Sequence, residues 1–330
     1  MADHQPKNHK EWERPIVEVE ETVAKLREAA RREKDDEKRA VYEAKADRAE
    51  DQKERYLRLL YSNLGPWEKT LVARADKRPY TLDYVQALFT DFVELQGDRR
   101  GFIDHAIVGG TAKLDGQPVM VLGHQKGRNI QERQLRNFGY ARPEGYRKAI
   151  RLFEMAERFR LPVVTFIDTP GADAGVEAES RGISEAIAAA IFAMFELTVP
   201  SVSVVIGEGG SGGAIGIAAS SRVLMLEHSI YSVIAPEGCA SILWRAPERG
   251  ADAARALRLT ADSALEYGII DGIISEPVGG AHRDPLTTFA SVKDAVQANL
   301  TEISALSPEA IREERYNKFR KMGQFDLLAP

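Results

Sequence analysis

The glycine-rich run from Val204 to Gly216, VVIGEGGSGGAIG, is the part of this sequence whose residue types most clearly suit chemistry. The stretch from Gly207 to Gly212 spells G-x-G-x-x-G, which is typical of loops that bind the pyrophosphate of a dinucleotide. The stretch from Gly209 to Gly213 spells G-x-S-x-G, which is typical of the turn that presents a nucleophilic serine, here Ser211. One loop cannot serve both chemistries, so the surrounding sequence has to decide between them.

The dinucleotide interpretation requires a strand before the loop, a crossover helix after it and an acidic residue about 20 residues further on. Glu227 lies 20 residues after Gly207 and satisfies the last condition. The helix after the loop can run only from about residue 213 to residue 220, which is short for a crossover in a doubly wound sheet. The loop also lies deep in the chain and not after its first strand, so the sequence disfavours this interpretation.

The hydrolase interpretation requires an acidic residue and then a histidine after the nucleophilic serine. This order is available from Asp262, Glu266 or Asp271, followed by His282. In a chain with 50 acidic residues, such an order arises easily by chance. The sequence before His282 also lacks the strand that usually presents this histidine, so this interpretation is disfavoured as well.

A third interpretation is that the glycines only allow a strand and a helix to pack closely. That explains one or two glycines but not five in seven residues, because each glycine costs backbone entropy on folding. We therefore expect bare backbone N–H groups that face a ligand at a helix N-terminus and stabilise an oxyanion. The segment Thr169–Ala172, TPGA, is expected to place a second backbone surface beside this loop.

The elements that must position these loops are typical of an α/β protein. A strand pair is predicted at residues 105–114 and 118–123, joined by a turn at the sequence DGQ. Two further strands, which open at Pro162 and Pro200, each run into glycines and then into a helix. The offset of about 38 residues between them indicates repeated strand-strand-helix units. Later strands are predicted at RVLMLE and IYSVIA, followed by helices around Ala240, Ala253 and Leu265.

An amphipathic helix is predicted at residues 144–159, and its inner side is expected to carry Ile150, Phe153, Met155 or Ala156, and Phe159. Arg147 and Lys148 are expected to be surface charges of this helix. Elsewhere, Glu237 is expected to cap a helix N-terminus, and Cys239 to be a small buried residue.

Residues 17–60 contain no glycine or proline and are rich in strong helix formers. Their apolar residues form only a narrow stripe, so we expect a helical arm that is either solvated or folded as a hairpin that clasps a partner chain. The sequence Asn63–Trp67, NLGPW, is expected to end this helix. The predicted domains are a charged helical arm at 1–62, a catalytic domain at 63–285 and a helical tail at 286–330.

Composition limits the class of protein. The net charge of −5 gives no overall attraction to nucleic acid or membranes, and a single cysteine excludes an internal disulfide. The N-terminal sequence lacks an apolar signal core, and no apolar run is long enough to span a bilayer. We expect a soluble, cytoplasmic protein. His124 and His282 have no companion histidines at metal-ligand spacing, so no metal site is expected on this chain.

Several longer blocks carry a family resemblance: VGGTAKLDGQPVMVLGHQKGR, RNFGYARPEGYRKAIRLFEMAERF, PVVTFIDTPGA, VIGEGGSGGAIGIA, YSVIAPEGCASILW and EPVGGAHRDP. In sequence and order they resemble the alpha subunits of bacterial acetyl-CoA carboxylase carboxyltransferases, from about Leu64 to Pro285. One departure is visible, since the family commonly reads T-P-G-A-Y-P-G where this chain has Asp173 and Ala174. We expect a more flexible loop there, with a carboxylate close to a site that handles anions.

The resemblance implies a crotonase-type (ClpP/crotonase) fold of ββα units. It also implies an α2β2 carboxyltransferase in which the beta subunit carries a zinc ribbon and which works with biotin carboxylase and the biotin carboxyl carrier protein. The implied reaction moves a carboxyl group from carboxybiotin to acetyl-CoA and gives malonyl-CoA for fatty-acid synthesis. Carboxyl transfer to, or decarboxylation of, another acyl-CoA remains the main alternative.

The resemblance also implies the roles of individual residues. The alpha subunit serves the biotin side, so the backbone of Gly212 and Gly213 is expected to form an oxyanion hole toward carboxybiotin. The residues expected to shape the approach to this hole are Gly209, Gly210, Ser211, Pro170, Gly171 and Ala172. Lys126 and Arg128, in the sequence GHQKGR, are possible contacts for an anion. No catalytic side chain is required, because the cofactor carries the chemistry and the protein orients it.

Overall fold

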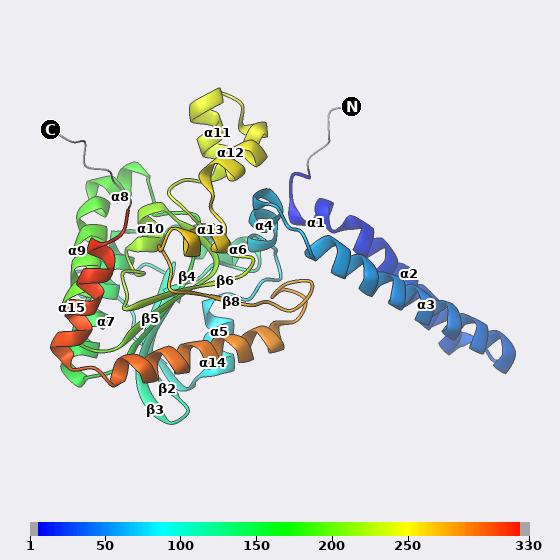
Figure 1. The fold of residues 1–330 in the computed structure, drawn as a ribbon, viewed down its shortest axis with the longest axis horizontal. Coiled ribbons are helices and arrows are strands. Elements are labelled where there is room, and N and C mark those ends of the chain that lie inside the picture. The colour runs from blue at the N-terminus through cyan, green and yellow to red at the C-terminus, as the bar shows by residue number, and fades with distance from the viewer. Residues whose placement is uncertain (1–5, 324–330) are drawn as a thin grey trace.

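Eight strands form one mixed sheet in the computed structural model, which describes residues 6–323 (Figure 1). The order across the sheet is β1-β2-β3-β4-β5-β6-β8, and β7 pairs with the far end of β5. The strands are β1 (Thr90–Glu94), β2 (Ile107–Leu114), β3 (Gln117–His124), β4 (Val163–Thr169), β5 (Ser201–Gly210), β6 (Arg222–Leu226), β7 (Ile230–Ser232) and β8 (Gly272–Ile274).

The predicted strand pair is confirmed as the antiparallel hairpin β2–β3, in which Leu114 pairs with Gln117. Asp115 and Gly116 form its two-residue turn, and both have positive φ angles, of 46° and 82°. A turn of this kind matches the twist of the two strands, which is why an Asp-Gly pair predicts it well.

From β3 to β6 the strands are parallel and follow one another in sequence order across the sheet. A doubly wound dinucleotide fold reverses its strand order at the point where the ligand binds. The order of β3, β4, β5 and β6 contains no such reversal, so the topology gives further reason to set the dinucleotide interpretation aside.

Helices cover both faces of the sheet, as parallel strands require. One face packs against α7 (Pro143–Phe159) and α9 (Ile183–Glu196), and the core there includes Leu122, Phe153 and Met194. The other face packs against α5 (Thr81–Leu88) and α14 (Pro285–Ser304), and includes Phe166 and Val296. Every residue of β4 is buried between these two layers.

The inner side of α7 differs from the prediction in two respects. Its buried apolar residues include Tyr146, Ala149, Leu152, Phe153 and Ala156. Phe159, predicted to face inward, is 64% exposed at the end of the helix. Lys148, predicted to be a surface charge, is buried, and its ammonium group donates to the carbonyls of Asp104 and Ile107. The aliphatic stem of a lysine can lie in a core when its charged end finds such acceptors.

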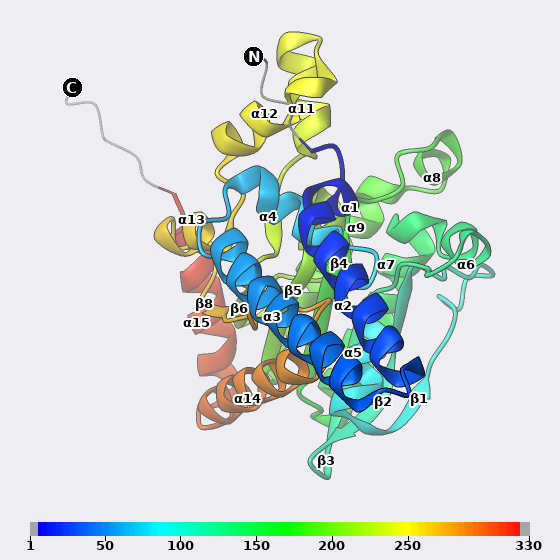
Figure 2. The ribbon, with the colours of Figure 1, turned by 90° about the vertical axis from the view of Figure 1, so that its right-hand side faces the viewer.

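The N-terminal residues fold as a helical hairpin that projects from the body of the molecule (Figures 1 and 2). It consists of α2 (Arg14–Arg32) and α3 (Asp36–Tyr61), which follow the short α1 (His9–Trp12). Within residues 17–60, only Ala30 and Ala46 are buried. The hairpin form of the predicted arm is therefore confirmed, while its contact with a partner chain stays a prediction.

The remaining helices complete the body. A small lobe of α11 (Pro236–Trp244) and α12 (Gly250–Leu257) packs through α12 on α4 (Pro66–Ala73), at the top of Figure 1. The others are α6 (Ile130–Leu135), α8 (Val176–Ser180), α10 (Ser211–Ile215), α13 (Ala261–Glu266) and α15 (Pro308–Arg320). Because α14 and α15 contribute Val292 and Ile311 to the core, the predicted tail packs against the main sheet. Among residues 6–323, none of the helices is both long and apolar enough to cross a membrane.

Candidate functional site

The glycine-rich run lies where β5 ends and α10 begins. The sequence predicts that the strand ends at Gly207, but β5 continues to Gly210, because Glu208, Gly209 and Gly210 pair with β7. Gly209 and Gly210 are thus the last strand residues and not loop residues. A β-carbon on Gly209 would stand 2.7 Å from the ring of Tyr231 in β7, which explains the absence of a side chain there.

The predicted approach of the TPGA segment to this run is confirmed. A β-carbon on Gly210 would stand 2.2 Å from the carbonyl oxygen of Pro170, and one on Gly213 would stand 2.5 Å from the carbonyl carbon of Gly171. Both distances are too short for any side chain. Two of the glycines are therefore required because the backbones after β4 and β5 touch.

Gly212 differs from its neighbours. A β-carbon there would meet only the side chain of Ile187, at an ordinary distance of 3.6 Å. The residue is half-buried, and its φ angle is not in the left-handed region, which Ser211 occupies instead with φ 51°. The strained position of this turn is thus the exposed Ser211, while Gly212 borders open space.

The N–H groups of Gly212 and Gly213 belong to the first turn of α10 and have no hydrogen-bond acceptor among the described residues. Helix geometry leaves such groups without an internal partner. Gly212 is half-buried and Gly213 is buried, and two adjacent donors in such a turn can bind an oxygen that carries negative charge.

The TPGA segment supports this turn. The hydroxyl oxygen of Thr169 accepts the N–H of Gly171 at 3.1 Å. Beyond it, the Asp173 carboxylate accepts from Asn137 at 3.0 Å, from the backbone of Gly175 at 2.8 Å and from Arg142 at 3.3 Å. Asp173 thus ties the loop to its surroundings through three hydrogen bonds, and the greater flexibility expected from the sequence stays a prediction.

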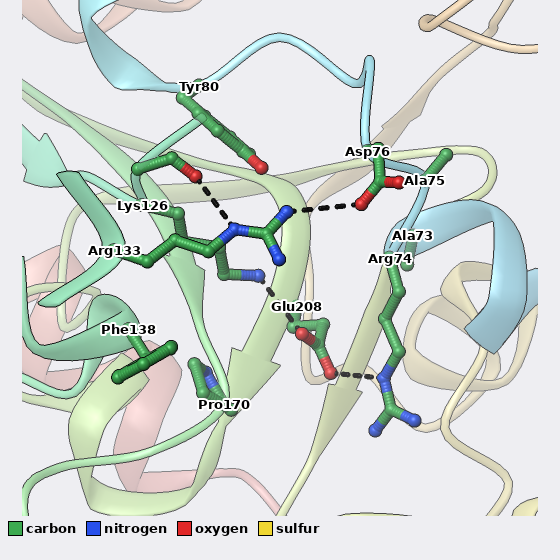
Figure 3. A pocket seen from close by; sticks show the side chains of 11 residues that line it. Ala73, Arg74, Ala75, Asp76, Tyr80, Lys126, Arg133, Phe138, Pro170 and Glu208 are labelled. Carbon is green, nitrogen blue, oxygen red and sulfur yellow. Dashed lines mark hydrogen bonds and ion pairs between the residues drawn. The ribbon is translucent and has the colours of Figure 1, made fainter. Parts of the chain in front are cut away.

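A cavity of about 200 Å³ opens next to Pro170 (Figure 3). Its walls include two aromatic side chains, Tyr80 and Phe138, and five charged ones: Arg74, Asp76, Lys126, Arg133 and Glu208. Phe138 is 47% exposed and has a φ angle of 55°, which is rare for a bulky residue. Backbone strain of this kind is concentrated at functional sites.

Arg133 pairs with Asp76 at one side of the cavity, and the other charges form an alternating chain. The Lys126 ammonium nitrogen lies 2.7 Å from Asp168 Oδ1 and 3.0 Å from Glu208 Oε2. Arg74 Nε lies 2.7 Å from Glu208 Oε1, and the same guanidinium also binds Glu237 on α11. The side chains of Lys126, Asp168 and Glu208 are at most 15% exposed, so these ion pairs are poorly screened by water.

This arrangement fixes the protonation states. Burial alone would raise the pKa of Glu208, but Lys126 and Arg74 outweigh it and lower that pKa to about 2. Burial alone would lower the pKa of Lys126, but Asp168 and Glu208 outweigh it and raise that pKa above its usual value. Both groups are therefore charged at neutral pH and neither is poised to exchange a proton.

Arg128, the other predicted anion contact, is engaged beside the cavity. Its guanidinium lies 4.0 Å above the ring of Tyr80 and donates to the carbonyls of Asp76 and Arg78. Glu237 lies in the first turn of α11 as predicted, although its carboxylate binds Arg74 and does not cap the helix. Cys239 is buried as predicted.

The acid and histidine candidates of the hydrolase interpretation are not assembled around Ser211. Asp262 binds Lys69, Glu266 binds Arg258 and Asp271 binds Lys318. His282 faces Glu13, the residue that precedes α2. Glu227, the candidate ribose ligand, accepts the backbone N–H of Glu276. His124 is fully buried, and burial lowers its pKa to about 3, so its ring is neutral.

Sequence reasoning missed Arg74, Asp168, Glu208, Tyr80 and Phe138, which surround Lys126 in space. Glu208 and Asp168 lie within two motifs that the sequence analysis identified by their glycines, so their carboxylates were not considered as site residues. Arg74 and Tyr80 carry no local signal, because their role depends on where α4 and the segment after it fold back onto β5.

Comparisons with a family model and with known proteins agree on one family for this chain. Residues 9–323 match the family model described as acetyl co-enzyme A carboxylase carboxyltransferase-like. The chain is 52% identical over 315 residues to the acetyl-coenzyme A carboxylase carboxyl transferase subunit alpha of Geobacter metallireducens, which covers 96% of this chain and 97% of the relative. It is 49% identical to the protein of the same name from Thermus thermophilus, over 96% of this chain and 98% of the relative.

Solved structures support the fold. A transcarboxylase 12S structure with methylmalonyl-coenzyme A and methylmalonic acid bound has a TM-score of 0.54 at 20% identity, over 69% of this chain and 43% of that one. A Pseudomonas malonate decarboxylase hetero-tetramer in complex with coenzyme A has a TM-score of 0.54 at 16% identity, over 66% of this chain and 88% of that one. At these identities the likeness concerns the fold alone, and it agrees with the predicted crotonase-like class of α/β protein.

Proposed function

The chain belongs to the acetyl-coenzyme A carboxylase carboxyltransferase-like family, and from this premise we propose that it is the alpha subunit of such an enzyme and acts on the biotin side of the reaction. It is a carboxyltransferase subunit whose full-length relatives carry that name. With a beta subunit it transfers the carboxyl group of carboxybiotin to acetyl-CoA and forms malonyl-CoA, an early step of fatty-acid synthesis. The observation that carries the residue assignment is the pair of unpartnered N–H groups at Gly212 and Gly213.

Carboxybiotin, when bound, supplies the activated carboxyl group, and negative charge develops on the ureido oxygen as that group leaves. The N–H groups of Gly212 and Gly213 donate to this oxygen. Each such donor stabilises charge that exists only during the reaction, which is how an oxyanion hole accelerates a step. Ser211 turns its exposed side chain away from the core and has no role as a nucleophile in this proposal.

The residues around the donors determine their position. Gly210 and Gly213 touch the backbone of Pro170 and Gly171, so the turn after β5 cannot move without the loop after β4. Gly209 anchors the same turn to β7. Ala172, half-buried beside them, completes the wall. This packing holds the two N–H groups in place before the ligand arrives, which lowers the cost of reorganisation during the reaction.

The cavity beside Pro170 is the proposed entry for the biotin group. Tyr80 and Phe138 offer flat apolar surfaces, and Lys126 provides a fixed positive charge at the cavity wall for a carboxylate. Arg128 contributes by stacking on Tyr80 and holding that ring in place.

The proposal includes partners that this chain does not contain. These are a zinc-ribbon beta subunit in an α2β2 assembly, the biotin carboxyl carrier protein and biotin carboxylase. The thioester enolate is stabilised on the beta subunit, so the catalytic step assigned here needs no metal from this chain. A cytoplasmic location is part of the proposal and rests on the composition. Transfer to another acyl-CoA remains the second candidate, since the proposed biotin-side residues do not select the acyl group.

The proposal is tested by assaying the decarboxylation of malonyl-CoA in the presence of free biotin, which runs the transfer in reverse. The full-length chain, a beta subunit from the Geobacter metallireducens relative's enzyme and their mixture are compared. We expect activity only in the mixture, with methylmalonyl-CoA as the control for acyl preference. Full activity from this chain alone would refute the division of labour, and a preference for methylmalonyl-CoA would favour the second candidate.

A further inference from the structure

A second polar cluster lies away from the glycine-rich site, where the N-terminal arm meets the body. His9 and Glu13 are one helical turn apart before α2, and His282 lies in the turn that leads to α14. His282 is 269 residues from Glu13 along the chain. We call His9, Glu13 and His282 the arm-junction cluster.

The spacing of the three side chains matches a metal site. Glu13 Oε1 lies 3.6 Å from His9 Nε2 and 3.3 Å from His282 Nε2, and one ligand atom from each residue lies within 4.8 Å of the other two. Ligands about 2.1 Å from a tetrahedral zinc ion stand about 3.4 Å from one another. The two measured separations are close to that edge, so one ion can reach all three ligands with small side-chain movements.

Burial leaves His9 Nε2 in this cluster without a hydrogen bond within residues 6–323. The side chains of His9, Glu13 and His282 are 12%, 5% and 5% exposed. His9 Nε2 points toward Glu13, is shielded from solvent and has no hydrogen-bond partner among the described residues. A buried polar atom without a hydrogen bond loses its hydration without full compensation. A cation at this position would bind that nitrogen.

The surroundings are those of a supported ligand set. Arg283 donates to both oxygens of Glu13, at 3.0 and 2.8 Å, and the Tyr61 hydroxyl also donates to Oε1. Outer partners of this kind orient metal-binding carboxylates. The positive charge of Arg283 would repel a cation, but its third nitrogen binds Glu20 at 2.6 Å, and this second carboxylate offsets that charge.

The geometry points to a divalent transition-metal site formed by His9 Nε2, Glu13 Oε1 and His282 Nε2, and we propose that it binds one Zn²⁺ ion. Two imidazoles and one carboxylate are ligands that Zn²⁺ accepts in a tetrahedral site. The three residues also help to line a cavity of about 910 Å³, from which an ion can enter. Because His9 and Glu13 precede α2 while His282 belongs to the body, the ion ties the arm to the rest of the molecule.

Metal content of the full-length chain, prepared without an affinity tag and stripped with a chelator, tests this inference. After dialysis against Zn²⁺ and then against buffer, we expect about one ion per chain. His9→Asn and His282→Asn should each weaken Zn²⁺ binding by more than about 100-fold, since loss of a ligand costs more than loss of an outer partner. His105→Asn, at a histidine outside the cluster, should bind as the wild type does.

Two further measurements keep the test independent of how the variants fold. Co²⁺ in the wild-type chain should show the visible absorption of a tetrahedral site, and Zn²⁺ should slow proteolysis between α1 and α2. Absence of stoichiometric Zn²⁺ in the wild type, or unchanged binding in both folded histidine variants, would overturn the inference. Neither readout depends on carboxyl transfer, so these experiments test the metal site independently of the proposed function.

Discussion

Gly213 and Gly171 touch through their backbones, so that a β-carbon on Gly213 would stand 2.5 Å from the carbonyl carbon of Gly171. This contact joins the turn after β5 to the loop after β4. Gly210 and Gly213, where the two backbones touch, therefore differ from Gly212, which borders open space.

Ser211→Ala is expected to retain most of the carboxyltransferase activity, because the proposed step uses backbone donors and no hydroxyl chemistry. Gly212→Val should fold, since a β-carbon at this position meets only Ile187 at an ordinary distance, but it should obstruct the bound ligand. We expect a loss of about 100-fold or more, comparable with removal of one oxyanion donor. Steady-state kinetics of the assembled enzyme measure both variants, with Gly212→Ala as the milder control.

Two other outcomes would point to the rejected interpretations of this loop. If Ser211→Ala is inactive while its fold is intact, and an acyl-serine can be trapped, Ser211 is a nucleophile. If NAD binds in a calorimetric titration and Glu227→Ala weakens that binding, the loop holds a dinucleotide. We expect neither result.

Phe138→Ala should raise KM for free biotin by about 10-fold and change kcat much less. Phe138 lies in the cavity wall near Pro170 and contributes a flat contact surface, and about 1.4 kcal/mol of lost contact corresponds to a factor of 10. Phe138→Tyr keeps the ring and serves as the control. An unchanged KM in the alanine variant would place the biotin group elsewhere.

Lys126→Met should lower the free energy of unfolding by about 3–5 kcal/mol, because it leaves Asp168 and Glu208 buried without their shared partner. Urea denaturation followed by circular dichroism measures the change. Lys25→Met is the matched control, since Lys25 is 79% exposed and its ion pair with Glu21 should be worth less than about 1 kcal/mol. If Lys126→Met and Lys25→Met lower the free energy of unfolding equally, the buried ion pairs of Lys126 do not stabilise the fold more than an exposed pair does.

Acid should weaken the fold through Glu208. Its pKa is lowered from 4.5 to about 2 in the folded chain, so its stabilising contribution is present above pH 4.5 and is lost as the pH falls toward 2. By about pH 3 this loss amounts to about 2 kcal/mol. Glu208→Gln should remove that part of the pH dependence while leaving the contribution of other carboxylates. Urea denaturation at several pH values measures the free energy of unfolding of both proteins. If this free energy changes with pH in the same way in the wild type and in Glu208→Gln, Glu208 has no such role.

Deletion of residues 17–60 should weaken oligomer assembly more than it weakens the fold of the body. Only two residues of this segment are buried, while Ile16 and Tyr61 at its ends pack in one cluster and can be joined by a short linker. Light scattering at low micromolar concentration measures assembly with the beta subunit, and thermal unfolding measures the fold. An intact tetramer without the hairpin would rule out a role of the arm in assembly.

The sequence by itself determined the features that depend on neighbouring residues. Asp115 and Gly116 predict the β2–β3 turn because few other residues adopt its positive φ angles. The absence of glycine and proline predicts the long helices α2 and α3. The blocks that resemble a family identified the fold class and the activity before any packing was known.

Tertiary structure alone decided which distant residues meet. The sequence shows Lys126, Asp168 and Glu208 in three separate motifs, and only the parallel pairing of β4 with β5 beside β3 brings them within 3.0 Å of one another. The same holds for Glu13 and His282, which local spacing cannot relate because 269 residues separate them. Periodicity likewise placed Phe159 inside and Lys148 outside, and the structure reverses both. The burial of a side chain depends on the length of the neighbouring strands and on the acceptors that packing provides, and neither is encoded in the spacing of residues along one helix.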